Sequence, residues 1–209
     1  KPSSAASDVY KRQGKIVFAG IGKSGLIGRK ISATFSSVGI PSFFCDPAQA
    51  LHGDMGQIEK KDILIIFSYS GNTSELTNML KYANRFRIKI IGVASKPDSL
   101  LLKASDIKLV LPKVKESDVT GMVPTSSTSI TMLLGDCLAT TVMHKKKFSK
   151  EKFKIFHPGG NIGGGRSPSR ARLRARLAGN GGTFPYGRLY LPCRCPSFAA
   201  SSFRQPLHG

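Results

Sequence analysis

Short apolar runs alternate along this chain with segments that repeat apolar residues at helical spacing. Five runs are almost wholly apolar, as expected of strands buried on both faces of a sheet. They span residues 15–19, 42–45, 63–67, 89–94 and 107–111. Apolar residues three or four positions apart predict helices over 26–38, 74–85, 99–103 and 124–146. Strands that alternate with helices predict an α/β fold, a parallel five-stranded sheet with helices on both faces.

The composition of the chain changes abruptly at residues 163–165. Basic residues before this point are mostly lysines, whereas residues 164–209 carry eight arginines and no lysine or acidic residue. No helical or strand periodicity continues past Arg176. We therefore expect a folded domain over 14–163 and an Arg-rich tail over 164–209 that is either a disordered basic arm or non-native. Residues 1–13 resemble a non-native leader, and we set them outside the predicted fold.

The formal net charge of +20, from 32 basic and 12 acidic residues, first suggests a nucleic-acid-binding protein. The Arg-rich tail supplies much of that charge, so the charge alone does not assign a nucleic-acid partner to the domain. No apolar run reaches the ~18 residues of a membrane span. Four cysteines without a secretory signal do not predict a disulfide framework. We expect a cytoplasmic protein with neither a nucleic-acid nor a membrane partner.

The loop after the first predicted strand, residues 20–25, fits the pattern G-x-G-x-x-G of dinucleotide-binding folds. Asp46 lies at about the distance of a ribose-binding acid. The loop is not a phosphate-binding Walker A loop, because Val17 stands where that motif requires glycine. Lys23 places a cation where exposed backbone N–H groups already favour an anion. The alternative is a surface lysine beside a turn that serves packing.

The loop after the third predicted strand, residues 68–75, is rich in hydroxyl groups and leads directly into a helix. Hydroxyls and backbone N–H groups at a helix N-terminus suit a phosphate monoester. Ser70 or Thr73, together with Glu75, could instead be ordinary helix caps. Four hydroxyl residues exceed the need of a cap, so phosphate binding is the favoured interpretation.

Further polar residues stand in turns and loops of the predicted domain. His52 and His157 lie in glycine-rich turns that could project a side chain into a cleft, and Glu116 lies in the loop after the fifth strand. Each could equally be a turn histidine or a solvated carboxylate. Their spacing does not match a zinc site, and we expect no metal and no cofactor.

Five segments, in this order, resemble the sugar isomerase (SIS) domain family of bacterial arabinose-5-phosphate isomerases. They are residues 20–25, 50–54, 68–75, 124–128 and 157–160, and the resemblance extends over 14–163. It implies a flavodoxin-like sheet and a homo-oligomer, a tetramer in the family, with its active site near a subunit boundary. It also implies interconversion of D-ribulose 5-phosphate and D-arabinose 5-phosphate, which begins the Kdo branch of lipopolysaccharide synthesis.

The resemblance also implies roles for individual residues. The implied catalytic set is Lys23, Glu75, Glu116 and His157. The implied substrate-binding residues are Gly22, Ser24, His52, Ser68, Ser70, Thr73, Ser126 and Ser127. Isomerisation through a cis-enediol needs a carboxylate base, a second proton-transfer group and a cation. Either glutamate could be the carbon base, with His157 moving oxygen protons and Lys23 stabilising the enediolate.

The sequence departs from the family at both ends. Members have helices before the first strand and a pair of CBS domains after the His-Pro-Gly-Gly segment, where this chain has the leader and the tail. A rival hypothesis keeps the fold without the chemistry, as a sugar-phosphate-binding regulatory module. A nicotinamide-dependent oxidoreductase would rest only on residues 20–25 and Asp46.

Overall fold

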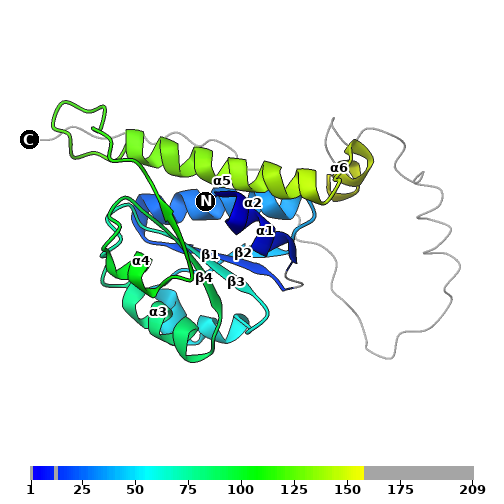
Figure 1. Ribbon diagram of the computed structural model, residues 1–209, viewed down its shortest axis with the longest axis horizontal. Coiled ribbons are helices and arrows are strands. Elements are labelled where there is room, and N and C mark those ends of the chain that lie inside the picture. The colour runs from blue at the N-terminus through cyan, green and yellow to red at the C-terminus, as the bar shows by residue number, and fades with distance from the viewer. Residues whose placement is uncertain (1, 12–13, 158–209) are drawn as a thin grey trace, which may run out of the picture. The chain divides into compact units, whose positions relative to one another are not determined.

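The computed structural model describes residues 2–11 and 14–157, which lie within one compact unit (Figure 1). Five parallel strands form its sheet in the order β2-β1-β3-β4-β5. They are β1 (Ile16–Gly20), β2 (Ser42–Phe44), β3 (Ile63–Phe67), β4 (Lys89–Ala94) and β5 (Ile107–Val110). This is the flavodoxin-like order, so the predicted fold class is confirmed. The strand order reverses at β1, because β2 lies on one side of β1 and the next strand, β3, lies on the other.

Helices cover both faces of the sheet (Figure 1). The helices are α1 (Pro2–Lys11), α2 (Gly22–Ser37), α3 (Leu76–Arg85), α4 (Leu100–Ala104), α5 (Ser126–Lys145) and α6 (Lys150–Phe156), with short 3-10 helices η1 (Gln49–His52) and η2 (Asp54–Gln57). Alternate residues of β1 point to opposite faces of the sheet and enter different cores. Ile16 and Phe18 pack in the core beneath α2 and α5. Val17 and Ala19 pack in the core beneath α3 and α4. None of the described helices has the length and apolar character needed to cross a bilayer.

The N-terminal segment requires a correction. Residues 2–11 form α1 rather than lying outside the fold, and Ala5, Ala6 and Val9 are buried in the core shared with α2 and α5. Asp8 of this helix also pairs with Lys89 of β4, at 2.7 Å between Oδ2 and Nζ. Helix α6 and the two 3-10 helices were not predicted either. The predicted tail over 164–209 lies outside the described residues.

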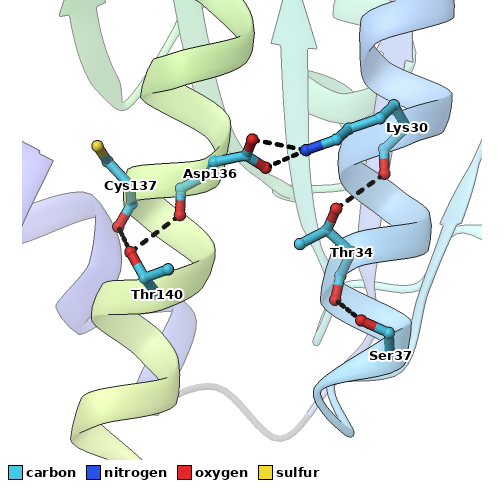
Figure 2. A network of polar contacts seen from close by, with 6 residues as sticks. All are labelled: Lys30, Thr34, Ser37, Asp136, Cys137 and Thr140. Carbon is cyan, nitrogen blue, oxygen red and sulfur yellow. Dashed lines mark hydrogen bonds and ion pairs between the residues drawn. The ribbon is translucent and has the colours of Figure 1, made fainter. Parts of the chain in front are cut away.

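Helices α2 and α5 approach each other closely at Gly135. A Cβ atom built there would lie 2.0 Å from Cδ1 of the fully buried Ile31, so any residue other than glycine would force the Ile31 side chain or α2 to shift. Figure 2 shows Lys30 of α2 reaching the Asp136 carboxylate of α5 beside this contact, with 2.6 Å from Nζ to Oδ2. Both helices begin at the carboxyl edge of the sheet, so this contact sets the distance between their first turns.

We predict that Gly135→Ala lowers the free energy of unfolding by about 1–2 kcal/mol. Overpacking against Ile31 costs more than the better helix propensity of alanine returns. Urea denaturation of both proteins measures the difference. Gly56→Ala is the matched control, since a Cβ atom there meets no atom within 4 Å and stability should change little. Equal stability of Gly135→Ala and the unaltered chain would mean that the two helices can separate at no cost.

Candidate active site

A cavity of about 440 Å³ opens at the carboxyl edge of the sheet, where the strand order reverses. Ligands of open α/β sheets bind at this position. Its walls come from the turn after β1, the loop after β3, the segment 112–125 and the first turns of α5. Four of the predicted site residues line it together, namely Lys23, Ser24, Glu116 and Ser127.

Lys23 stands on the first turn of α2, directly after the glycine turn. The backbone requires glycine at two positions of this turn. Gly22 has a φ of +57°, and a Cβ atom on Gly25 would lie 2.6 Å from the carbonyl oxygen of Gly20. The dinucleotide-like pattern is therefore explained by the packing of α2 on the end of β1. The Lys23 side chain is exposed and makes no ion pair with another described residue, so its charge is available to a ligand.

Glu116 is half-buried and caps the N-terminus of α5. Its Oε2 accepts hydrogen bonds from the Thr125 N–H at 2.8 Å, the Thr125 hydroxyl at 3.1 Å and the Ser127 N–H at 3.2 Å. The Ser127 hydroxyl, followed by the Thr125 N–H, lowers the pKa of Glu116 to about 2. The carboxylate is therefore a firmly held negative charge in the same cavity as the Lys23 ammonium.

The hydroxyl-rich loop after β3 keeps its shape through its own hydrogen bonds. Ser68 is buried, lies 2.8 Å from the Thr73 hydroxyl and accepts the Gly71 N–H at 3.1 Å. Gly71 has a φ of +71°, and a Cβ atom there would lie 2.2 Å from the Ser99 hydroxyl oxygen. Ser70 is exposed, and its hydroxyl oxygen accepts the Asn72 N–H at 3.3 Å, which leaves its O–H free to donate. Ser68 therefore shapes the loop, and Ser70 offers its hydroxyl to a ligand.

Glu75 does not line the 440 Å³ cavity, although it stands at the same edge of the sheet. It is exposed and accepts the Ser74 hydroxyl at 2.8 Å. Its own backbone N–H, and then the Ser74 hydroxyl, lower its pKa. Glu75 directly precedes α3, and its side chain makes no capping hydrogen bond to that helix.

His157 is not brought to the cavity within one chain. It ends α6, where its Nδ1 lies 2.9 Å from the Phe153 carbonyl oxygen and its ring stacks on Phe153. Helix α6 follows the far end of α5, a helix about 30 Å long, and Ser127 at the other end of α5 lines the cavity. The Pro158, Gly159 and Gly160 of its motif lie outside the described residues.

The other predicted binding residues also lie apart from the cavity walls. His52 is exposed at the end of η1, and Ser126 is half-buried on the first turn of α5. Gly22 borders a neighbouring cavity of about 460 Å³ that Asp46 also lines. The Asp46 carboxylate there accepts the Ala48 N–H at 3.0 Å and faces Arg29 at 3.6 Å. Its engagement within its own chain gives no support to a ribose-binding role.

Two observations complete the description of the cavity. Tyr69 lines the cavity, although the sequence analysis considered this residue only as part of the hydroxyl-rich loop. Its position between Ser68 and Ser70 was the one available signal. Across residues 2–11 and 14–157, no three His, Cys, Asp or Glu side chains gather in a group that could hold a metal ion.

Comparison with known proteins matches the SIS domain family over residues 9–141. Arabinose 5-phosphate isomerase KdsD of Escherichia coli (strain K12) is 40% identical over 159 residues, which are 76% of this chain and 48% of that protein. Protein RP505 of Rickettsia prowazekii is 45% identical over 151 residues, 72% of this chain and 47% of its own length. The chain spans about half the length of these curated relatives.

A protein of E. coli CFT073, solved in complex with A5P, shares the fold with a TM-score of 0.73 and 35% identity. That match covers 75% of this chain and 83% of the other.

We predict that Ser127→Ala raises the pKa of Glu116 from about 2 toward its ordinary value of 4.5. The variant loses the largest stabilisation of the charged carboxylate, while the backbone N–H groups remain. Carboxyl ¹³C titration measures the change, with Glu116→Gln to assign the signal. Ser126→Ala is the control, because the Ser126 hydroxyl bonds no other described residue. An unchanged pKa in Ser127→Ala would contradict this assignment.

The lowered pKa of Glu116 also makes the free energy of unfolding depend on pH. A depressed folded-state pKa contributes stability above the unfolded value of 4.5, and that contribution is lost as pH falls toward 2. We therefore predict that Ser127→Ala shows a smaller loss of stability than the unaltered chain over this window. Urea unfolding at several pH values between 4.5 and 2 measures it.

Proposed function

We propose, from the premise that this chain belongs to the SIS domain family, that it is a phosphosugar isomerase. The observation that carries the proposal is the meeting of Lys23 and Glu116 in one cavity at the β1/β3 crossover, next to the hydroxyl-rich loop. Binding of a phosphosugar alone requires no carboxylate, which favours the enzyme over a regulatory binding module. The 40% identity to an arabinose 5-phosphate isomerase and the A5P complex of a 35% identical protein support the same choice.

The finer proposal is the interconversion of D-ribulose 5-phosphate and D-arabinose 5-phosphate, the first step toward Kdo and lipopolysaccharide. A base removes a proton from C1 of the ketose, and the C2 carbonyl oxygen takes a proton to give the cis-enediol. Reprotonation at C2, with loss of the O1 proton, then forms the aldehyde. The reaction needs no external oxidant or reductant.

Lys23 is suited to the charge that develops on the enediolate oxygens. Lys23 is exposed on the first turn of α2 and lines the cavity. A cation fixed where charge develops lowers the barrier because it needs no reorganisation during the reaction. We assign Lys23 as the electrostatic stabiliser.

Glu116 is the better placed of the two carbon-base candidates, because it lies in the cavity and Glu75 does not. A carboxylate with a pKa of about 2 is a weak proton acceptor. Substrate hydroxyls that compete for Thr125 and Ser127 would weaken the capping bonds and raise that pKa. We propose that substrate binding itself activates Glu116 in this way.

The phosphate group fits the loop after β3. The exposed Ser70 hydroxyl and the nearby N-terminus of α3 offer donors and a positive dipole end. Thr73 stands on the same loop, and Ser24 and Ser127 offer further hydroxyls from the cavity wall. Tyr69 belongs to both the loop and the cavity, so a phosphate on the loop leaves the sugar carbons facing Lys23 and Glu116.

His157 and His52 enter the proposal through the homo-oligomer that the resemblance implies. His157 lies at the opposite end of α5 from the cavity, so it would serve the cavity of a neighbouring copy. There it would move protons between the substrate oxygens, because an imidazole has one nitrogen that can donate a proton and one that can accept it.

We expect Lys23→Gln and Glu116→Gln each to lower the kcat for D-arabinose 5-phosphate formation by at least about 10²-fold. The assay follows turnover of D-ribulose 5-phosphate by the 209-residue chain. Lys81→Gln removes an exposed lysine of α3 that lies outside the cavity and should turn over normally. Binding of arabinose 5-phosphate without turnover by the unaltered chain would replace the isomerase with the regulatory module.

The shared site is tested by mixing two inactive variants. Glu116→Gln and His157→Ala chains, unfolded and refolded together, should regain part of the activity, because some mixed sites then receive both intact residues. Each variant refolded alone is the control. No gain on mixing, with His157→Ala inactive by itself, would place both residues in sites of one chain and contradict the exchange between copies.

A further inference from the structure

The Tyr69 phenol joins two loops that belong to different strands. Its oxygen donates to the Pro112 carbonyl at 3.2 Å and accepts the Val114 N–H at 3.0 Å. Its half-buried ring packs against the core beneath α2 and α5 and also lines the 440 Å³ cavity. One side chain thus connects the hydroxyl-rich loop after β3 with the segment that carries Glu116.

The backbone of Tyr69 is firmly held on the sheet side. Its carbonyl oxygen accepts the Ser95 N–H at 2.8 Å and the Ser95 hydroxyl at 2.7 Å, and Ser95 directly follows β4. Because these bonds fix the residue to the end of a central strand, its phenol is a rigid anchor for whatever it contacts.

The segment 112–125 is held by individual hydrogen bonds. It contains no helix or strand, and Val119 and Met122 are largely exposed. The Asp118 carboxylate accepts the N–H groups of Thr120 and Val123, both at 2.9 Å, and the Ser117 N–H donates to the Thr125 hydroxyl at 2.9 Å. Glu116 ties the early part of the segment to Thr125 at its end and to Ser127 of α5, and Tyr69 ties the residues just before Glu116 to the sheet. Val114, which donates to the phenol, stands two residues before Glu116.

We infer that Tyr69 is a positioning residue that holds the segment 112–116 so that the Glu116 carboxylate stays on the first turn of α5, inside the cavity. The catalytic consequence rests on the proposed isomerase function, whereas the effect on Glu116 itself does not. Without the phenol oxygen, the Glu116 carboxylate is hydrogen-bonded to Thr125 and Ser127 for a smaller fraction of the time. Its pKa then rises toward 4.5.

The charged surroundings of Glu116 stay the same in such a variant. Lys23 of α2 is the other charged side chain on the described cavity wall, and α5 presents only the hydroxyls of Ser127, Thr128 and Thr131 there. On its own segment, Lys115 and Asp118 are the nearest charged residues along the chain. A shift in the titration of Glu116 therefore reports its hydrogen bonds.

The test compares Tyr69→Phe with Tyr82→Phe in the 209-residue chain. Tyr82 is also half-buried, but its hydroxyl bonds no other described residue, so the control removes the same atom without loss of a bond. We expect Tyr69→Phe to raise the ¹³C-detected pKa of Glu116 and to speed amide exchange over 113–118 by about fivefold to tenfold. We expect Tyr82→Phe to change neither.

The unaltered chain gives a second measurement that does not depend on the folding of a variant. The Val114 N–H should exchange more slowly than those of Lys113 and Lys115, which bond no described acceptor. Equal exchange of all three, or an unchanged pKa and exchange pattern in folded Tyr69→Phe, would overturn the inference.

Turnover separates this inference from the proposed function. If the unaltered chain isomerises D-ribulose 5-phosphate, Tyr69→Phe should lower kcat about tenfold with a smaller change in KM, because the Glu116 carboxylate is less often in place. The acid limb of the variant's pH profile of kcat should move to higher pH. An active chain with an unaltered pH profile in Tyr69→Phe overturns the positioning role alone. A chain without turnover overturns the isomerase, while titration and exchange still decide the role of Tyr69.

Discussion

The close approach of α5 to α2 sets the shape of the candidate active site. Gly135 lets the two helices meet at Ile31, and the Lys30–Asp136 pair joins them beside that contact (Figure 2). Interiors are packed too densely to absorb an added methyl group without a shift. Because the first turns of both helices form cavity walls, a shift at Gly135 would move the Lys23 ammonium relative to the α5 terminus that Glu116 caps.

The capping of α5 by Glu116 links stability to reactivity. Hydrogen bonds from Thr125 and Ser127 order an otherwise irregular segment and give the carboxylate a strong preference for its charged form. Those bonds also make it a poor base until something displaces them. A substrate that offers hydroxyl groups to the same donors would exchange one set of bonds for another, so the energy of binding could be used to activate the base.

The sheet, and the position of Lys23 and Glu116 at its carboxyl edge, could be predicted from the sequence because both follow local rules. Strands buried on both faces have almost wholly apolar sequences, and polar loops that follow such strands meet at one edge, which brought Lys23 and Glu116 together. Helix α1 was missed because residues 1–13 were interpreted as a leader, and the small side chains of Ala5 and Ala6 give little hydrophobic signal against that interpretation. The remoteness of His157 depends on the length and direction of α5, which no local pattern encodes. Tyr69 was considered only as part of the hydroxyl-rich loop, because its hydrogen bonds depend on the path of a loop more than 40 residues later.

Under the proposed isomerase function, the cavity of a single chain lacks one of the groups that the reaction needs. Lys23 brings an ammonium group to the cavity, and Glu116 brings a carboxylate whose pKa is lowered to about 2. The described histidines, His52, His144 and His157, all lie outside this cavity. Enediol chemistry also requires proton transfer between two oxygens, for which an imidazole is suited because one of its nitrogens can donate a proton and the other can accept it. Assembly of copies would bring such a group to the cavity, so catalysis would depend on oligomerisation as strongly as on the fold of each chain.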